Sequence, residues 1–135
     1  MKPGGIILII DDSSADRRFF KDAIQEIDPS CEVRQAINGV EGLKQLRELK
    51  PLPNFIFLDL NMPMMNGQEC LAEIMKDDVL KSIPVIIYTT GEYENNKHLV
   101  IEGGAASFLS KPWAISDIPL EIRRVLEEVE IRLQL

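Results

Sequence analysis

The sequence predicts an α/β protein built on a parallel sheet, because two hydrophobic patterns alternate along the chain. Apolar runs of four to six residues alternate with longer stretches in which apolar residues recur at helical spacing. The first run, Ile6–Ile10, has no polar residue, which is typical of parallel strands buried on both faces. The alternation favours five strands and five helices in a doubly wound arrangement.

The predicted strands are short and end at polar or turn-forming residues. They cover residues 6–10, 32–37, 55–58, 84–88 and 107–109.

Helices are predicted between these strands and after the last one. Ser13 or Ser14 can cap the first helix, and Pro29 ends it. Asn66 with Glu69 resembles a capping box for the third helix. The second helix has Val40, Leu43, Leu46 and Leu49 on its apolar side. The fourth helix opens at Glu92–Asn96 and closes at Gly103-Gly104, and the fifth helix starts at about Ser116.

Length and composition indicate one cytoplasmic domain spanning residues 1–135. The 22 acidic and 15 basic residues give a net charge of −7, which argues against binding to nucleic acid or anionic lipid. No apolar run approaches the roughly 20 residues that span a bilayer. Cys31 and Cys70 are too few for a disulfide framework and favour a reducing compartment.

Polar side chains follow four of the five predicted strands. They are Asp11 and Asp12, Asp59 with Asn61, Thr89 with Thr90, and Lys111. In an open parallel sheet, functional residues lie at the carboxyl ends of the strands. The strand order 2-1-3-4-5 of flavodoxin-like folds brings the first and third strands together, so the three aspartates are expected to converge.

Clustered carboxylates repel one another, by about 4 kcal/mol for two unit charges 4 Å apart at an effective dielectric constant of 20. A bound cation or a shared proton relieves this repulsion. Mg²⁺ prefers oxygen ligands of this kind and is often held by one or two carboxylates together with phosphate oxygens. Carboxylates, a metal ion, an ammonium and a hydroxyl are the groups needed for phosphoryl transfer to an aspartate.

The sequence resembles the response-regulator receiver domains of bacterial two-component signalling, in particular the chemotaxis-regulator-like ones. The resemblance extends from Ile6 to about Val129. The matching motifs are Asp11-Asp12, Asp59-Leu60-Asn61-Met62-Pro63, Asn66-Gly67, Thr89, Gly104-Ala105, Phe108 and Lys111-Pro112.

The resemblance implies that Asp59 is the phosphoacceptor of a Mg²⁺-dependent reaction, with Mn²⁺ able to substitute. Asp12 is then a direct metal ligand, and Asp11 acts directly or through a water. The backbone carbonyl of Asn61 is a further ligand, and Asp59 itself completes the metal set.

The resemblance also implies the groups that meet the phosphoryl group and report its presence. Thr89 and Lys111 contact phosphoryl oxygens, and Phe108 is the switch aromatic. Thr90 is larger than the residue often found there and is expected to crowd the pocket. The bond before Pro112 is a candidate cis peptide.

The partners implied are a sensor histidine kinase or a histidine phosphotransfer protein, and a downstream protein of unknown identity. About six residues follow Val129, too few for an output domain, so the switch is expected to act through contacts of its fourth helix, fifth strand and fifth helix in a phosphorelay. The protein is expected to be a monomer or a weak homodimer. Apart from phosphorylating and dephosphorylating itself, it is not expected to be an enzyme.

Two alternatives remain open from the sequence. One is a receiver-like scaffold that works without phosphate. The other is a phosphatase of the haloacid dehalogenase type, which also uses an aspartate nucleophile and Mg²⁺. Those enzymes place a second aspartate two residues after the nucleophile, where this chain has Asn61.

Overall fold

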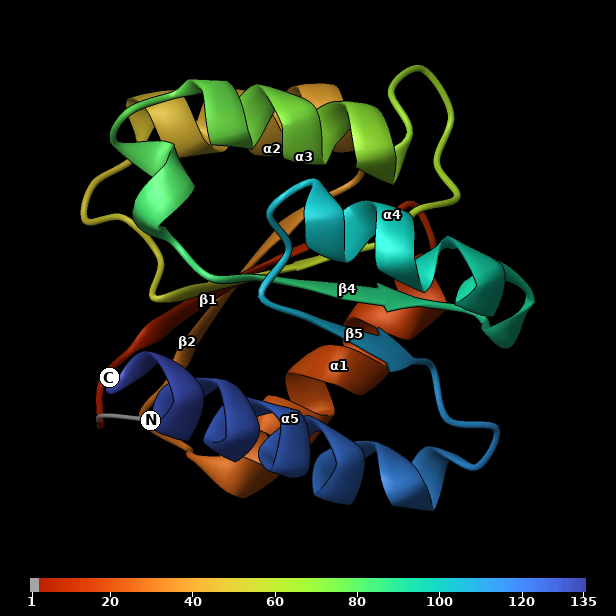
Figure 1. Cartoon of the computed structure of the whole chain (residues 1–135). Helices are drawn as coiled ribbons and strands as arrows, with labels where there is room; N and C mark the ends of the chain where they lie inside the picture. The colour runs from red at the N-terminus through yellow and green to blue at the C-terminus, as the bar shows by residue number, and fades with distance from the viewer. Residues whose placement is uncertain (1–2) are drawn as a thin grey trace.

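The computed structural model describes residues 3–135 as a five-stranded parallel sheet covered by helices on both faces (Figure 1). The strand order is β2-β1-β3-β4-β5, which confirms the predicted flavodoxin-like topology. Helices α2, α3 and α4 lie on one face, and α1 and α5 lie on the other. The elements are β1 (Ile6–Ile10), α1 (Ser14–Ile27), β2 (Glu32–Ala36), α2 (Gly39–Glu48), β3 (Phe55–Leu58), α3 (Gly67–Lys76), β4 (Val85–Thr89), α4 (Lys97–Glu102), β5 (Ser107–Ser110) and α5 (Ile118–Leu133).

The central strands are apolar throughout because both of their faces are buried. Every residue of β1, β3 and β4 is buried. Alternate side chains point to opposite faces, so Ile7 and Ile9 pack under α1 and α5, whereas Leu8 and Ile10 pack under α2 and α3. The sheet therefore separates two apolar clusters.

Local sequence signals determine where the helices begin. The Ser13 side chain accepts a hydrogen bond from the backbone of Asp16 and caps α1. Asn66 and Glu69 form the predicted capping box at the start of α3. These side chains satisfy backbone N–H groups that have no partner inside the helix.

Some details differ from the sequence predictions. Val40 and Leu49, expected on the apolar side of α2, are exposed, and Gly39 and Gly42 occupy the packed side instead. The segment Gly91–Asn96 is a 3₁₀ helix that precedes α4, and a 3₁₀ turn at Ile115–Asp117 precedes α5. Within residues 3–135, no helix has the length and apolar character needed to cross a membrane.

Candidate functional site

The sheet itself fixes the backbone of the two buried aspartates. The Asp11 N–H donates to the Ala36 carbonyl at 3.1 Å, and the Asp59 N–H donates to the Ile10 carbonyl at 3.0 Å. These bonds continue the pairing of β1 with β2 and β3 just past the strand ends. Both carboxylates are thereby held at the carboxyl edge of the sheet, as the sequence predicted.

The carboxylate of Asp59 is almost completely buried and has a different partner on each oxygen. The Thr89 hydroxyl donates to Oδ1 at 2.6 Å, and the Asn61 backbone N–H reaches the same oxygen at 3.4 Å. The Lys111 ammonium lies 3.4 Å from Oδ2. Three residues predicted from the sequence therefore surround Asp59 with hydrogen-bond donors.

The Lys111 ammonium lies among three carboxylates. Its distances are 2.7 Å to Asp11, 2.8 Å to Asp16 and 3.4 Å to Asp59. Burial alone lowers the pKa of Lys111, but the hydrogen bonds and charges of the carboxylates outweigh it and raise that pKa above its usual range. Lys111 therefore stays protonated at neutral pH.

Asp11 is fully buried, and its ionised form is disfavoured. Burial raises the pKa of Asp11 from 3.8 to about 6, the charge of Asp59 adds to the rise, and Lys111 opposes it. Oδ1 accepts a hydrogen bond from the Ser13 N–H at 2.9 Å. Oδ2 has only its ion pair with Lys111, and no hydrogen bond of good geometry within the described residues. A buried carboxylate oxygen in this position can accept a cation.

The acidic residues fit a hard divalent cation. Asp11, Asp12 and Asp59 each offer an oxygen, and these atoms lie within 4.8 Å of one another. Asp12 is exposed, so the cluster is open to solvent on one side. Mg²⁺ takes oxygen ligands and keeps several of its waters, which suits a cluster that is partly buried and partly exposed. The role of the Asn61 carbonyl as a further ligand stays a prediction.

Gly67 lets the loop after β3 pass directly behind Asp59. A Cβ atom at this position would lie 2.7 Å from Leu60 Cα and closer still to the Asp59 carbonyl oxygen. The Gly67 N–H also donates to the Leu60 carbonyl at 3.0 Å, which closes the loop. Any side chain here would displace the backbone of Asp59.

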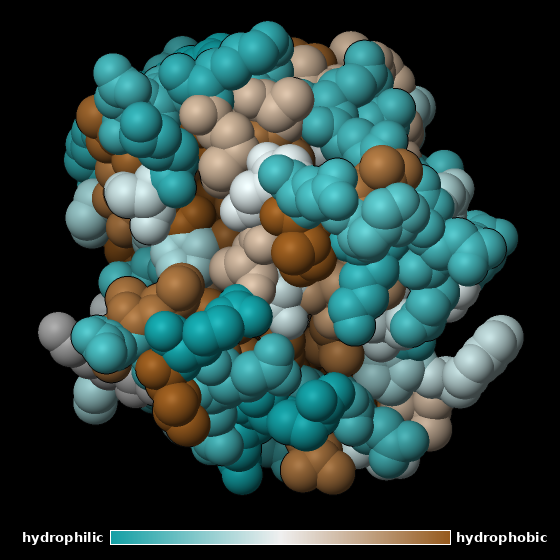
Figure 2. Space-filling model, viewed as in Figure 1, coloured by the Kyte–Doolittle hydropathy of each residue, from teal (hydrophilic) through white to brown (hydrophobic). Residues whose placement is uncertain are grey.

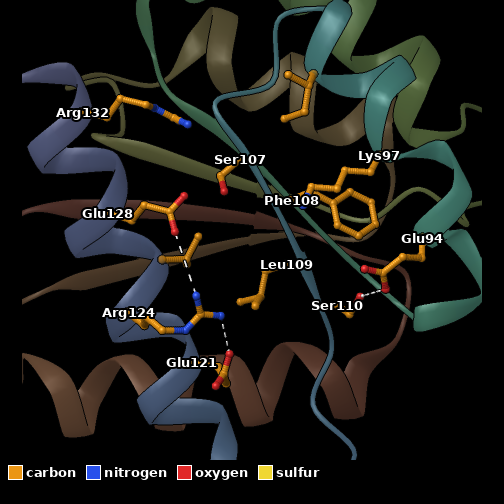
Figure 3. Close-up of a pocket in the computed structure, with 12 residues that line it drawn as sticks. Glu94, Lys97, Ser107, Phe108, Leu109, Ser110, Glu121, Arg124, Glu128 and Arg132 are labelled. Atoms are coloured by element: carbon orange, nitrogen blue, oxygen red, sulfur yellow. Dashed lines mark hydrogen bonds and ion pairs between the residues drawn. The ribbon is translucent and has the colours of Figure 1, made fainter.

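Two of the predicted residues lie outside this cluster. Thr90 is exposed, and its hydroxyl donates to Glu92 at 3.2 Å. Phe108 is half-buried on β5, where its ring extends beside Lys97 toward α4 (Figure 3). Phe108 thus lines a surface hollow of about 630 Å³ between α4, β5 and α5. The switch role that the resemblance implies for Phe108 therefore requires a structural link through the sheet between Asp59 and Phe108.

The prediction of a cis peptide bond before Pro112 is wrong for this structure. Within residues 3–135 the cis bond is Lys50–Pro51, and Lys111–Pro112 is trans. Only about 5% of X–Pro bonds in folded proteins are cis, because the trans form is favoured by about 0.5–1 kcal/mol.

Asp16 belongs to the site, although no sequence motif singled it out. It is the third residue of α1, and its N–H donates to the capping Ser13 hydroxyl at 3.2 Å. Its position was deducible in part, since a helix that begins at Ser14 places residue 16 in the turn next to the end of β1. The pairing of its side chain with Lys111, 95 residues away in sequence, could not be inferred without the folded structure.

Comparison with known families matches residues 7–123 to the response regulator receiver domain, and the chain belongs to this family. It is therefore a receiver of two-component signalling, with the acidic triad Asp11, Asp12 and Asp59 at the carboxyl edge of its sheet.

Two relatives illustrate how similar this chain is in sequence to known signalling proteins. It is 33% identical over 121 residues to the response regulator Rcp1 of Synechocystis sp., covering 86% of this chain and 82% of Rcp1. It is 28% identical over 122 residues to the sensor histidine kinase CheAY of Helicobacter pylori, covering 90% of this chain but only 15% of that much longer protein.

Solved structures of similar proteins agree with the fold. The Mn²⁺-bound form of Rcp1 matches with a TM-score of 0.77 and 29% identity, covering 93% of this chain and 91% of the other. The phosphorylated cyanobacterial phytochrome response regulator RcpA matches with a TM-score of 0.80 and 27% identity, with the same coverage. One similar receiver thus binds a divalent metal ion, and another carries a phosphoryl group.

Proposed function

We propose that this receiver is a switch operated by phosphorylation of Asp59, with a sensor histidine kinase or a histidine phosphotransfer protein as the donor. The observation that carries the proposal is the position of the Asp59 carboxylate. It accepts a hydrogen bond from Thr89, lies 3.4 Å from the Lys111 ammonium and clusters with the carboxylates of Asp11 and Asp12. The phosphorylated state of the similar receiver RcpA supports it.

In the proposed reaction, a carboxylate oxygen of Asp59 attacks the phosphorus of a phosphohistidine. The new P–O bond forms as the P–N bond breaks, and the leaving histidine nitrogen keeps the electron pair and takes a proton from solvent. The product is an acyl phosphate on Asp59. Thr89 and Lys111, which already donate to the carboxylate, are then placed to donate to the phosphoryl oxygens.

Asp11, Asp12, Asp59 and the Asn61 carbonyl are the proposed ligands of Mg²⁺, for which Mn²⁺ can substitute. When bound, the metal ion neutralises negative charge on the phosphoryl oxygens. The Mn²⁺-bound structure of Rcp1 supports a divalent cation in a receiver of this type. In this chain the acidic donor set supports it, because oxygens of Asp11, Asp12 and Asp59 lie within 4.8 Å of one another.

The switch is proposed to pass from β4 to β5. The Thr89 hydroxyl donates a hydrogen bond to Asp59. The backbone carbonyl of Thr89 accepts one from the backbone N–H of Lys111 at 2.6 Å. Transfer of the Thr89 hydroxyl to a phosphoryl oxygen would move the end of β4, and Ile87 on this strand is in register with Phe108 on β5. Phe108 can then repack against α4.

A downstream protein is proposed to read the change on the face formed by α4, β5 and α5. Figure 2 shows this face as mostly hydrophilic, with hydrophobic residues in the hollow between the helices. Glu94, Lys97, Arg124 and Glu128 lie around this hollow (Figure 3). A bias of a few kcal/mol is enough to shift a two-state surface of this kind.

We further propose that the receiver acts in the cytoplasm, without turnover of an external substrate. Cys31 and Cys70 are buried and form no disulfide, which fits a reducing compartment. Asn61 occupies the position at which a phosphatase of the alternative type needs an acid, so self-phosphorylation and dephosphorylation of Asp59 are the expected activities.

The test is intact-protein mass after incubation with acetyl phosphate and Mg²⁺. A gain of one phosphoryl group that is absent from Asp59→Asn and from a sample treated with EDTA supports the proposal. If no mass is gained and beryllofluoride does not bind, the phosphate-independent scaffold is correct instead. Continuous release of phosphate from many small esters would favour the phosphatase.

A further inference from the structure

The carboxylate of Asp16 contacts the ammonium of Lys111 although it has no role in the proposed reaction. Its Oδ2 lies 2.8 Å from Nζ, whereas the acceptor carboxylate of Asp59 lies 3.4 Å from Nζ. The ammonium therefore pairs more closely with Asp16 than with the residue to be phosphorylated.

Asp16 is held in place by the start of α1. Its N–H donates to the Ser13 hydroxyl, and the next side chain, Arg17, donates to the Asp11 carbonyl at 2.8 Å. The side chain of Asp16 is 37% exposed, compared with 1% for Asp11 and 6% for Asp59. Asp16 therefore contacts Lys111 from the solvent side of the cluster.

We propose that Asp16 is a positioning residue that competes with the phosphoryl group on Asp59 for the ammonium of Lys111. This inference rests on the proposed function. Asp16 holds Lys111 at the edge of the pocket before phosphorylation and weakens its hold on the phosphoryl group afterwards. It thereby limits how firmly the active state is maintained.

The competition follows from the number of donors and from charge. An ammonium has three N–H donors, and each one bonded to Asp16 is not available to the phosphoryl oxygens. The phosphoryl group brings about −1.5 to −2 charges, which the nearby carboxylate of Asp16 repels. Neutralising Asp16 should therefore strengthen binding of a phosphoryl mimic by about tenfold, the effect expected of one charge-assisted hydrogen bond at a partly exposed site.

The effect on Mg²⁺ should have the opposite sign. Without the charge of Asp16, the ammonium of Lys111 can move fully onto Asp11 and Asp59, where it competes with a metal ion for the same oxygens. Loss of one nearby negative charge also reduces the attraction of the cluster for a cation. A general loss of structure would instead weaken both ligands together.

The experiment compares the unsubstituted protein with Asp16→Asn and with Asp22→Asn as the matched control. Asp22 is an exposed carboxylate of the same helix, six residues further along the chain. Isothermal titration calorimetry measures Mg²⁺ binding alone, and then beryllofluoride binding at saturating Mg²⁺. Urea unfolding establishes that each variant is folded.

The expected result for Asp16→Asn is beryllofluoride affinity raised by about tenfold and Mg²⁺ affinity lowered, with Asp22→Asn unchanged in both. Beryllofluoride affinity that is equal or lower in Asp16→Asn would overturn the inference while leaving the proposed function intact. If the unsubstituted protein binds no beryllofluoride, the proposed function fails, and this inference fails with it.

Discussion

Replacing Asp11 by Asn is expected to stabilise the metal-free protein at pH 7. The pKa of Asp11 rises from 3.8 to about 6, mainly because the side chain is buried. One pKa unit corresponds to 1.36 kcal/mol, so keeping this carboxylate ionised in the fold costs about 3 kcal/mol. The attraction of Lys111 is already contained in that pKa. A neutral amide of the same shape avoids the cost, so Asp11→Asn should be more stable by up to about 3 kcal/mol.

The pH dependence has a definite sign. Asp11 loses its proton near pH 3.8 in the unfolded chain and near pH 6 in the folded one, so the folded state binds more protons between these values. The free energy of unfolding of the metal-free protein should therefore fall as the pH rises from about 4 to about 6, and this contribution should be constant above that. Asp11→Asn should lack this fall.

Urea unfolding in EDTA at pH 4.5 and pH 7 measures both effects. Asp12→Asn is the control, because Asp12 is exposed and its replacement should change stability by less than about 0.5 kcal/mol. With Mg²⁺ at saturation the order should reverse, since Asp11→Asn lacks a ligand. The reasoning is refuted if Asp11→Asn is equally or less stable than the unsubstituted protein in EDTA at pH 7.

Three further outcomes are expected. Gly67→Ala should lower stability by about 1–3 kcal/mol in urea unfolding, because its Cβ meets backbone atoms, whereas Gly91→Ala, with no atom within 4 Å of the added Cβ, should have little effect. Thr89→Ala should lower the free energy of unfolding by about 1–3 kcal/mol, because a buried oxygen of Asp59 loses a hydrogen-bond donor. Thr89→Ser keeps the hydroxyl and should recover most of this stability. Equal losses in both variants would contradict the prediction. Burial raises the pKa of the Cys70 thiol to about 12, so iodoacetamide at pH 8 should leave Cys70 unmodified in intact-mass measurements until urea unfolds the chain.

Much of the fold could be predicted because its signals are local. The unbroken run Ile6–Ile10 indicates a central strand, and Asn66 with Glu69 marks the start of a helix by hydrogen bonds within four residues. The convergence of Asp11 and Asp59 followed once the strand order placed β1 beside β3.

Features that depend on packing between distant elements could not be predicted in the same way. Val40 was expected in the core because it has helical spacing, but close packing of Gly42 against Ile10 selects a different side of α2. The pairing of Asp16 with Lys111 joins two residues that only the finished sheet brings together. The isomer of the bond before Pro112 depends on a difference of about 0.5–1 kcal/mol, which sequence alone does not resolve.

The sheet that divides the apolar interior has a consequence for how this protein can change. Phe57 packs with α1 and α5, while its neighbours Ile56 and Leu58 pack with the helices on the opposite face. Substitutions in separate clusters that share no neighbours have nearly additive effects on stability. Helix α4 can therefore accumulate changes that suit a new binding partner with little effect on the packing under α1, whereas α5, which also borders the proposed binding face, shares its apolar cluster with α1. Recognition through α4 can in this way diverge faster than recognition through α5 within one small fold.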